Sequence, residues 1–142
     1  MTMTATTETL PGQAKTKGGT TVYLQVDGAA QAAKFYERAF GAEITAMHPV
    51  DEKGCTMHVH LYVNGTTVML SDFYPEHGVP KVAPAGFSLT LHVSDIDTWY
   101  KRAVDAGASV GQPVTEMFWG DRYGSVKDPY GVTWAMNQAK SA

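Results

Sequence analysis

Two histidines of this chain alternate with apolar residues in the segment HVHLYV, where His58 and His60 stand two positions apart. In a β-strand such residues project from one face about 7 Å apart, a separation at which two imidazoles can bind one metal ion or one ligand. A histidine on a polar sheet face more commonly hydrogen-bonds a neighbour or water. Hydrogen bonding is therefore the favoured interpretation, and a displaced metal site is the alternative.

A second group of candidate residues is aromatic or acidic. Phe118 and Trp119 precede Gly120, where their rings can cover a flat or apolar ligand or can pack in the core. Asp72 and Phe73 follow a predicted strand. Asp72 can accept a hydrogen bond from a ligand there, although an aspartate at a strand end usually caps a turn.

The other chemistry-bearing residues favour no reaction. The sequence contains neither a nucleophile elbow nor a glycine-rich phosphate loop. Cys55 is the only cysteine, which excludes an internal disulfide and a cysteine-cluster zinc site and is consistent with a reducing cytoplasm. Asp121 and Arg122 are adjacent, and a contact that stabilises a turn is a better interpretation for them than acid-base catalysis.

Length and charge set the outer bounds. The chain has 142 residues, enough for one domain with a core, and a net charge of -3. Its basic residues are scattered, which argues against nucleic acid as a partner, and no signal sequence or membrane span is visible. We expect a cytoplasmic protein without a membrane partner. Residues 1–18 contain little to bury and predict a disordered tail.

The elements that must position the candidates occur as one pattern repeated twice. Each copy has an alternating strand, a helix closed by a Gly-Ala pair, and three further strands. The first copy predicts strands at 21–26, 43–50, 56–63 and 66–71 and a helix at 29–40, with an Asn64-Gly65 hairpin turn. The second predicts strands at 88–93, 109–116, 122–127 and 132–137, with a helix from Ser94, its expected cap, to Gly107.

This βαβββ pattern predicts an α+β fold, a single domain over 19–140 with repeat one at 19–74 and repeat two at 86–140. We expect a curved, mixed, eight-stranded sheet around a cleft, with the helices on its outer face. Alternation places Trp134 on the helix side. The opposite face is then polar and is expected to carry Thr21, Tyr23, Gln25, His58, His60, Tyr62, Ser88, Thr90, His92, Thr133 and Ala135.

The motifs VYLQVDG, KFYERAFGAE, HVHLYVNGTTVMLSD and FWGDRYGSVKDPYGVTWAMN carry a resemblance to a known family. The chain resembles the vicinal oxygen chelate superfamily of glyoxalases, bleomycin-resistance proteins and extradiol dioxygenases, and within it the PhnB-like branch. The resemblance covers roughly residues 21–140. It implies a small organic ligand, a two-fold homodimer, and a segment containing Phe118 and Trp119 over the mouth of a cleft.

The resemblance also implies a divalent metal bound by one residue from each of four strands. Those positions fall on Thr21, Ser71 or its neighbour Leu70, Ser88 and Ala135. Hydroxyl groups and a methyl group do not bind a catalytic metal firmly, so we expect no metal at this site and no cofactor.

The leading hypothesis is a small-molecule binding protein without the standard metal site. The alternative is a lyase, isomerase or dioxygenase-type enzyme that uses displaced ligands or His58 as a catalytic acid-base group. Fold alone does not decide between them. The expected ligand-binding residues are Tyr23, His58, His60, Ser71, Asp72, Phe73, His92, Phe118 and Trp119.

Overall fold

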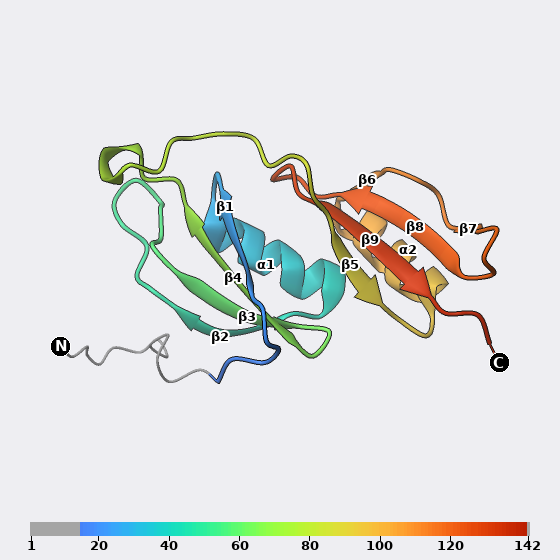
Figure 1. The fold of residues 1–142 in the computed structure, drawn as a ribbon. Helices are drawn as coiled ribbons and strands as arrows, with labels where there is room; N and C mark the ends of the chain where they lie inside the picture. The colour runs from blue at the N-terminus through green and yellow to red at the C-terminus, as the bar shows by residue number, and fades with distance from the viewer. Residues whose placement is uncertain (1–14, 142) are drawn as a thin grey trace. The chain divides into compact units, whose positions relative to one another are not determined.

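The computed structural model describes residues 15–141. Within them the chain forms two α-helices, one short 3-10 helix and nine strands (Figure 1). It divides into two compact units, the first made of residues 15–37 and 41–83 and the second of residues 38–40 and 84–141. The break after Ala83 falls in the loop between the two predicted repeats.

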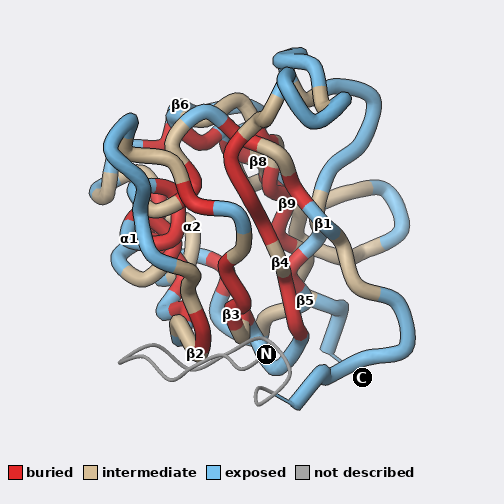
Figure 2. Tube along the Cα trace, turned by 90° about the vertical axis from the view of Figure 1, so that its left-hand side faces the viewer, coloured by how far each residue is buried: buried red, intermediate tan, exposed pale blue. Residues whose placement is uncertain are grey.

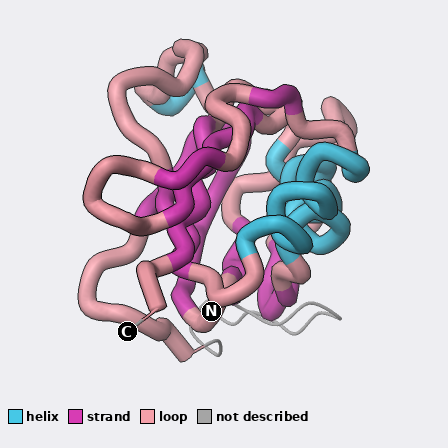
Figure 3. The backbone as a smooth tube through the Cα atoms, turned by 90° about the vertical axis from the view of Figure 1, so that its right-hand side faces the viewer, coloured by secondary structure: helices cyan, strands magenta, loops and turns pink. Residues whose placement is uncertain are grey.

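The first unit is a four-stranded sheet with one long helix. Its elements are β1 (Val22–Val26), α1 (Ala29–Phe40, whose last three residues belong to the second unit), β2 (Glu43–Met47), β3 (Val59–Val63), β4 (Thr66–Asp72) and the 3-10 helix η2 (Pro75–His77). The strand order is β1-β4-β3-β2, with β1 parallel to β4 and the remaining neighbours antiparallel. Figure 3 shows that the chain between β4 and β5 is mostly loop.

The β3–β4 hairpin has the predicted turn and register. Asn64 and Gly65 both have positive φ, 50° and 80°, as a two-residue hairpin turn of this kind requires. Val63 pairs with Thr66 and His60 with Met69, so the turn fixes which side chains share a face.

The second unit repeats the arrangement with one strand interrupted. Its elements are β5 (Leu89–His92), α2 (Ile96–Ala106), β6 (Ser109–Val110), β7 (Thr115–Glu116), β8 (Arg122–Lys127) and β9 (Thr133–Gln138). The order is β5-β9-β8-β6, and β7 also pairs with β8. The predicted strand 109–116 is therefore two short strands, because Pro113 has no N–H to donate to a ladder.

The α+β class and the doubled pattern are confirmed, with one difference in the sheet. The strands form two separate hydrogen-bonded sheets, of four and five strands, where a single eight-stranded sheet was expected. The additional strand comes from the interruption at Pro113.

Helix α2 begins one residue later than expected. Its cap is Asp95, not Ser94: the Asp95 carboxylate accepts hydrogen bonds from the Thr98 backbone N–H at 3.3 Å and from the Thr98 hydroxyl at 2.7 Å. A carboxylate also interacts favourably with the positive end of the helix dipole. The predicted end at Gly107 is confirmed.

Each sheet has an apolar face in the core. Buried side chains dominate β4, whose trace is mostly red in Figure 2. Trp134 is fully buried and contacts the ring of Phe40, with 4.5 Å between ring centroids, which confirms its predicted core position.

Residues 1–14 of the predicted tail lie outside the described residues. Of the remainder, Lys17 exchanges hydrogen bonds with Thr67: its N–H donates to the Thr67 hydroxyl at 2.7 Å, and its carbonyl accepts from the Thr67 N–H at 3.0 Å. Among residues 15–141, neither α-helix is long and apolar enough to span a membrane.

Candidate functional site

The polar face of the first sheet is the face opposite its apolar core. Directly paired residues point to the same side of a sheet, and Tyr23, Met69 and His60 form one such row across β1, β4 and β3. Gln25 pairs with Ser71 in the next row, and the β3–β4 register, extended by one residue, brings His58 opposite Ser71. The predicted alternation is thus present in the first unit.

A hydrogen-bonded cluster lies on this face. The Tyr23 hydroxyl is 2.9 Å from Nδ1 of His58, and the two rings lie with 5.6 Å between centroids. Ser71 hydrogen-bonds Tyr23 and also donates to the Asp72 carbonyl at 3.0 Å. We call Tyr23, His58, His60 and Ser71 the histidine cluster.

His60 is the most buried member of the histidine cluster. Its side chain is fully buried, and its Nδ1 is 2.6 Å from the Thr45 hydroxyl of the neighbouring strand. A short irregularity in the β2–β3 register lies between Ile44 and Ala46, so Thr45 occupies the extra position of a bulge.

Both histidines of the cluster have a buried nitrogen with no hydrogen-bond partner among the described residues. In each ring it is Nε2, while Nδ1 contacts a hydroxyl. Buried polar groups nearly always have a partner, so two orphaned nitrogens on one sheet face need an explanation.

Burial dominates the electrostatics of the histidine cluster. It lowers the pKa of His60, and it lowers the pKa of His58 with further contributions from the charges of His48 and His60. Burial raises the pKa of Tyr23, partly offset by its hydrogen bond with Ser71. All three side chains are therefore uncharged at neutral pH.

His48 belongs beside this cluster, although the sequence suggested no function for it. The backbone N–H of His48 donates to the His58 carbonyl at 2.9 Å, and the centroids of the two imidazole rings are 5.7 Å apart. The pairing of the predicted strands 43–50 and 56–63 would have placed His48 next to His58. The sequence does not fix this pairing, because no short turn joins the two strands.

Asp72 is a structural residue in this unit. Its carboxylate accepts hydrogen bonds from the backbone N–H groups of Gly28 at 2.8 Å, Ala29 at 3.2 Å and Thr56 at 2.8 Å. It therefore satisfies the start of α1 from a distant strand, where Gly28 has no side chain to do so. Asp72 and the adjacent Phe73 also line a separate cavity of about 290 Å³ at the ends of β1 and β4, together with Asp27, Asp51, Cys55, Tyr74 and Lys81.

Three predicted ligand-binding residues lie in the second unit. His92 is exposed at the end of β5. Phe118 and Trp119 form an edge-to-face pair at the β7–β8 turn, with 4.8 Å between centroids, and are 96 % and 48 % exposed. The two rings pack against each other at the surface. Phe118 is therefore not a core residue, which was one of its two predicted roles.

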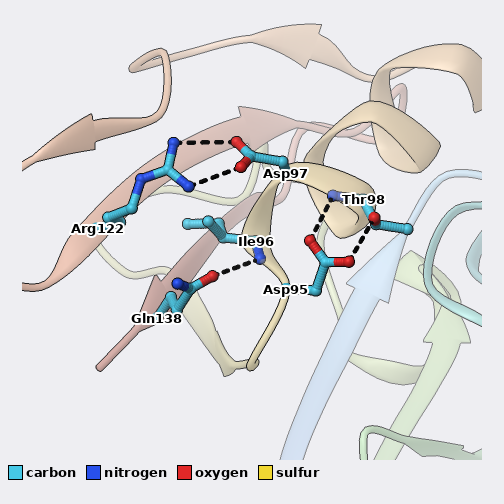
Figure 4. A network of polar contacts seen from close by, with 6 residues as sticks. All are labelled: Asp95, Ile96, Asp97, Thr98, Arg122 and Gln138. Carbon is cyan, nitrogen blue, oxygen red and sulfur yellow. Dashed lines mark hydrogen bonds and ion pairs between the residues drawn. The ribbon is translucent and has the colours of Figure 1, made fainter. Parts of the chain in front are cut away.

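Asp121 joins this turn to β9 and the chain after it, whereas Arg122 pairs with helix α2 and not with a turn. Asp121 accepts from the Asn137 amide at 3.0 Å and from the Lys140 N–H at 2.9 Å. Arg122 makes a two-pronged ion pair with Asp97 of α2, at 2.7 and 3.0 Å (Figure 4). These hydrogen bonds hold the pKa of the Asp97 carboxyl and that of the Asp121 carboxyl below the ordinary value.

The residues at the four implied metal positions do not fit a divalent metal. Thr21, Ser71 and Ser88 offer only hydroxyls, and Ala135 offers no donor. Within residues 15–141, no group of three or more His, Cys, Asp or Glu side chains is arranged to hold a metal ion.

The family model of the Glyoxalase/Bleomycin resistance protein/Dioxygenase superfamily matches residues 19–136. This range includes both units and nearly all the described elements. The chain belongs to this superfamily. The resemblance found in the sequence motifs is thereby confirmed.

Individual relatives agree with this membership. The uncharacterized protein Rv0887c of Mycobacterium tuberculosis is 40 % identical over 122 residues, which cover 82 % of this chain and 71 % of that protein. TioX of Micromonospora sp. has a similar structure, with a TM-score of 0.68 and 28 % identity over 85 % of this chain and 98 % of that one. The PhnB protein of Bacillus cereus has a TM-score of 0.68 and 26 % identity over 86 % of this chain and 100 % of that one.

Proposed function

We propose that this superfamily member is a binding protein for a small organic molecule and works without the superfamily's four-position metal. The ligand lies on the polar face of the first unit, against Tyr23, His58 and Ser71. One observation carries the proposal: Nε2 of His58 and of His60 is buried without a partner in the described residues. A bound molecule that hydrogen-bonds them would remove this cost.

The surroundings of the histidine cluster support binding. Tyr23 is 42 % exposed, so its ring offers aromatic surface to a ligand beside polar groups that fix orientation. Ser71 is 7 % exposed and contributes through its hydrogen bond to Tyr23. His92, Phe118 and Trp119 stay predicted ligand-binding residues of the second unit.

A second candidate function is catalytic. The Tyr23 hydroxyl, 2.9 Å from Nδ1, orients the His58 ring and leaves Nε2 as a base. Such a pair fits the proton transfers of a lyase or isomerase and needs no metal. It predicts turnover of the bound molecule, whereas the binding function predicts retention of the molecule unchanged.

The deciding experiment is a fragment screen against the purified protein, followed by mass spectrometry of each bound compound. His58→Gln and Ser71→Ala are the test variants, and His77→Gln, on the exposed η2 helix, is the matched control. We expect binding that the test variants weaken about tenfold or more and the control does not, with the compound recovered unchanged. Chemical conversion lost in His58→Gln would favour the enzyme. Binding that no test variant affects would contradict a site on this face.

Elemental analysis addresses the metal directly. We expect background levels of transition metals before and after chelation. One equivalent of metal per chain, lost in His58→Gln or His60→Gln, would replace the binding function by a displaced metal centre.

We also propose that the protein is a cytoplasmic homodimer. Self-complementary pairing is the commonest form of oligomer, and large apolar side chains such as Phe118 and Phe87 are exposed on the single chain. Sedimentation equilibrium should give twice the chain mass; a monomer at micromolar concentration would contradict the proposal.

A further inference from the structure

The proton positions on the two imidazoles follow from counting hydrogen-bond donors. At His60, the Thr45 hydroxyl lies 3.1 Å from the His60 carbonyl and 2.6 Å from Nδ1. A hydroxyl has one proton to donate. If Thr45 donates it to the carbonyl, its oxygen accepts from an Nδ1–H and both contacts are hydrogen bonds. If Thr45 donates to Nδ1, the carbonyl contact is lost.

The same count applies at His58. The Tyr23 hydroxyl lies 3.4 Å from the Met57 carbonyl and 2.9 Å from Nδ1 of His58, and Ser71 donates to the Asp72 carbonyl. Tyr23 also hydrogen-bonds Ser71, so four contacts share the protons of Tyr23, Ser71 and Nδ1. With a proton on Nδ1, three of the four contacts can be hydrogen bonds; without it, only two can. With Nδ1 unprotonated, Tyr23 donates to it and the Met57 carbonyl loses its donor.

The orphaned atoms point to the same assignment. Nε2 is buried in both rings and lacks a partner in the described part of the chain. An unpaired buried acceptor occurs more often in proteins than an unpaired buried N–H. Placing both protons on Nδ1 leaves two lone pairs unpaired and no N–H.

We propose that His58 and His60 each present an Nε2 lone pair to the ligand, which is an uncharged molecule with N–H or O–H donors, such as an amide or a phenol. This inference rests on the proposed function and names the ligand class of the same site. An organic anion is excluded because a neutral imidazole with its proton on Nδ1 offers a carboxylate neither a positive charge nor a free N–H. Burial, which lowers the pKa of both rings, keeps them neutral.

A ligand reaches the His58 lone pair past aromatic neighbours. The rings of Tyr23 and His48 pack on His58 at 5.6 and 5.7 Å between centroids, and Tyr23 borders the surface with 42 % of its area exposed. Because Nε2 itself is buried, binding must shift one of these rings. Their NMR signals are therefore expected to move on binding.

The first test needs no ligand. Long-range proton–nitrogen correlation spectra of nitrogen-15-labelled protein at pH 7.5 distinguish a protonated from an unprotonated ring nitrogen, and His58→Gln and His60→Gln assign the signals. We expect a protonated Nδ1 and an unprotonated Nε2 in both rings. A protonated Nε2 in either ring overturns the inference while leaving the proposed function standing.

The second test compares matched probes by ligand-observed NMR: phenol against anisole, and benzamide against benzoate. We expect phenol and benzamide to bind, to shift Tyr23 or His48 signals, and to bind about tenfold more weakly to His58→Gln but not to His77→Gln. Benzoate or anisole binding with the same dependence on His58 overturns the ligand class and keeps the site. Failure of all four probes to bind overturns both proposals.

Discussion

Each unit contains one buried aspartate that accepts several N–H groups, and the two differ in how far those groups lie along the chain. Asp72 of the first unit takes the N–H groups of Gly28, Ala29 and Thr56, which are 16 to 44 positions away. Asp128 of the second unit takes those of Tyr130, Val132 and the Trp134 indole, 2 to 6 positions away. The first aspartate joins separate segments, and the second closes one turn.

The polar faces differ in a related way. In the second unit two polar side chains have partners from neighbouring loops: Asn137 donates to Asp121 at 3.0 Å, and the Ser125 hydroxyl accepts from the Gln112 N–H at 2.9 Å. In the first unit His58 and His60 each keep an unpaired Nε2 among the described residues. Among the described residues, the buried side-chain nitrogen and oxygen atoms without a partner are thus both in the first unit, where they are left for a ligand.

Replacement of Asp72 by alanine should have the largest effect. It leaves three backbone N–H groups without their acceptor, and we expect the free energy of unfolding to fall by about 3–5 kcal/mol. Urea denaturation measures it. The matched variant is Asp128→Ala, expected to lose about 1 kcal/mol less than Asp72→Ala because its donors can reach water when the turn opens. An equal or smaller loss in Asp72→Ala would contradict the distinction between long-range and local anchoring.

Trp134→Phe should have the next largest effect. Phenylalanine keeps most of the buried ring but removes the indole N–H that donates to Asp128 at 3.0 Å, and it leaves a small cavity. We expect a loss of about 2 kcal/mol in the free energy of unfolding. In Asp128→Ala the same replacement should cost about 1 kcal/mol less, since the hydrogen bond is already gone; additive losses would show that the bond contributes nothing.

The sequence was most informative where local chemistry decides the structure. The Asn64-Gly65 turn predicted the β3–β4 register, and through it the shared face of His60 and Met69, because asparagine followed by glycine readily adopts the two successive positive φ angles of this turn. Glycines likewise predicted both helix ends. The polar face of the first unit followed from alternation alone.

The remainder depends on contacts between distant segments. No local pattern shows that Asp72 satisfies α1 across 44 positions, or that His48 meets His58, since no tight turn fixes the β2–β3 register. The choice between Ser94 and Asp95 as cap is a one-residue difference between two good capping residues. The unpartnered Nε2 atoms could not be predicted, because a nitrogen is known to lack a partner only when all its neighbours in space are known.

A smaller effect is expected in the pH dependence of the free energy of unfolding, to which His58 and His60 of the first unit contribute. Burial lowers the pKa of His58 and His60 below the ordinary value of 6.5, so the folded chain binds protons there less readily than the unfolded chain. The unfolded state therefore gains protons first as the pH falls below 6.5, and the free energy of unfolding decreases. The slope is at most about 1.4 kcal/mol per pH unit for each histidine.

The control for the titration is the double variant His58→Gln, His60→Gln. Urea midpoints between about pH 5.5 and 7.5 should decline with acid in the natural chain and vary less in the double variant. Parallel profiles in the two proteins would refute the assignment of this pH dependence to His58 and His60.

The smallest effect is expected at the ion pair between Arg122 and Asp97 (Figure 4). Both side chains are substantially exposed, at 37 % and 66 %, so water and salt screen the attraction. Arg122→Ala should shift the urea midpoint less than any of the variants above, and less still at 0.5 M salt. Asp97→Ala in the same background should add almost nothing. A shift as large as that of Asp128→Ala would mean that long-range ion pairing, and not the local turn at Asp128, anchors the second unit.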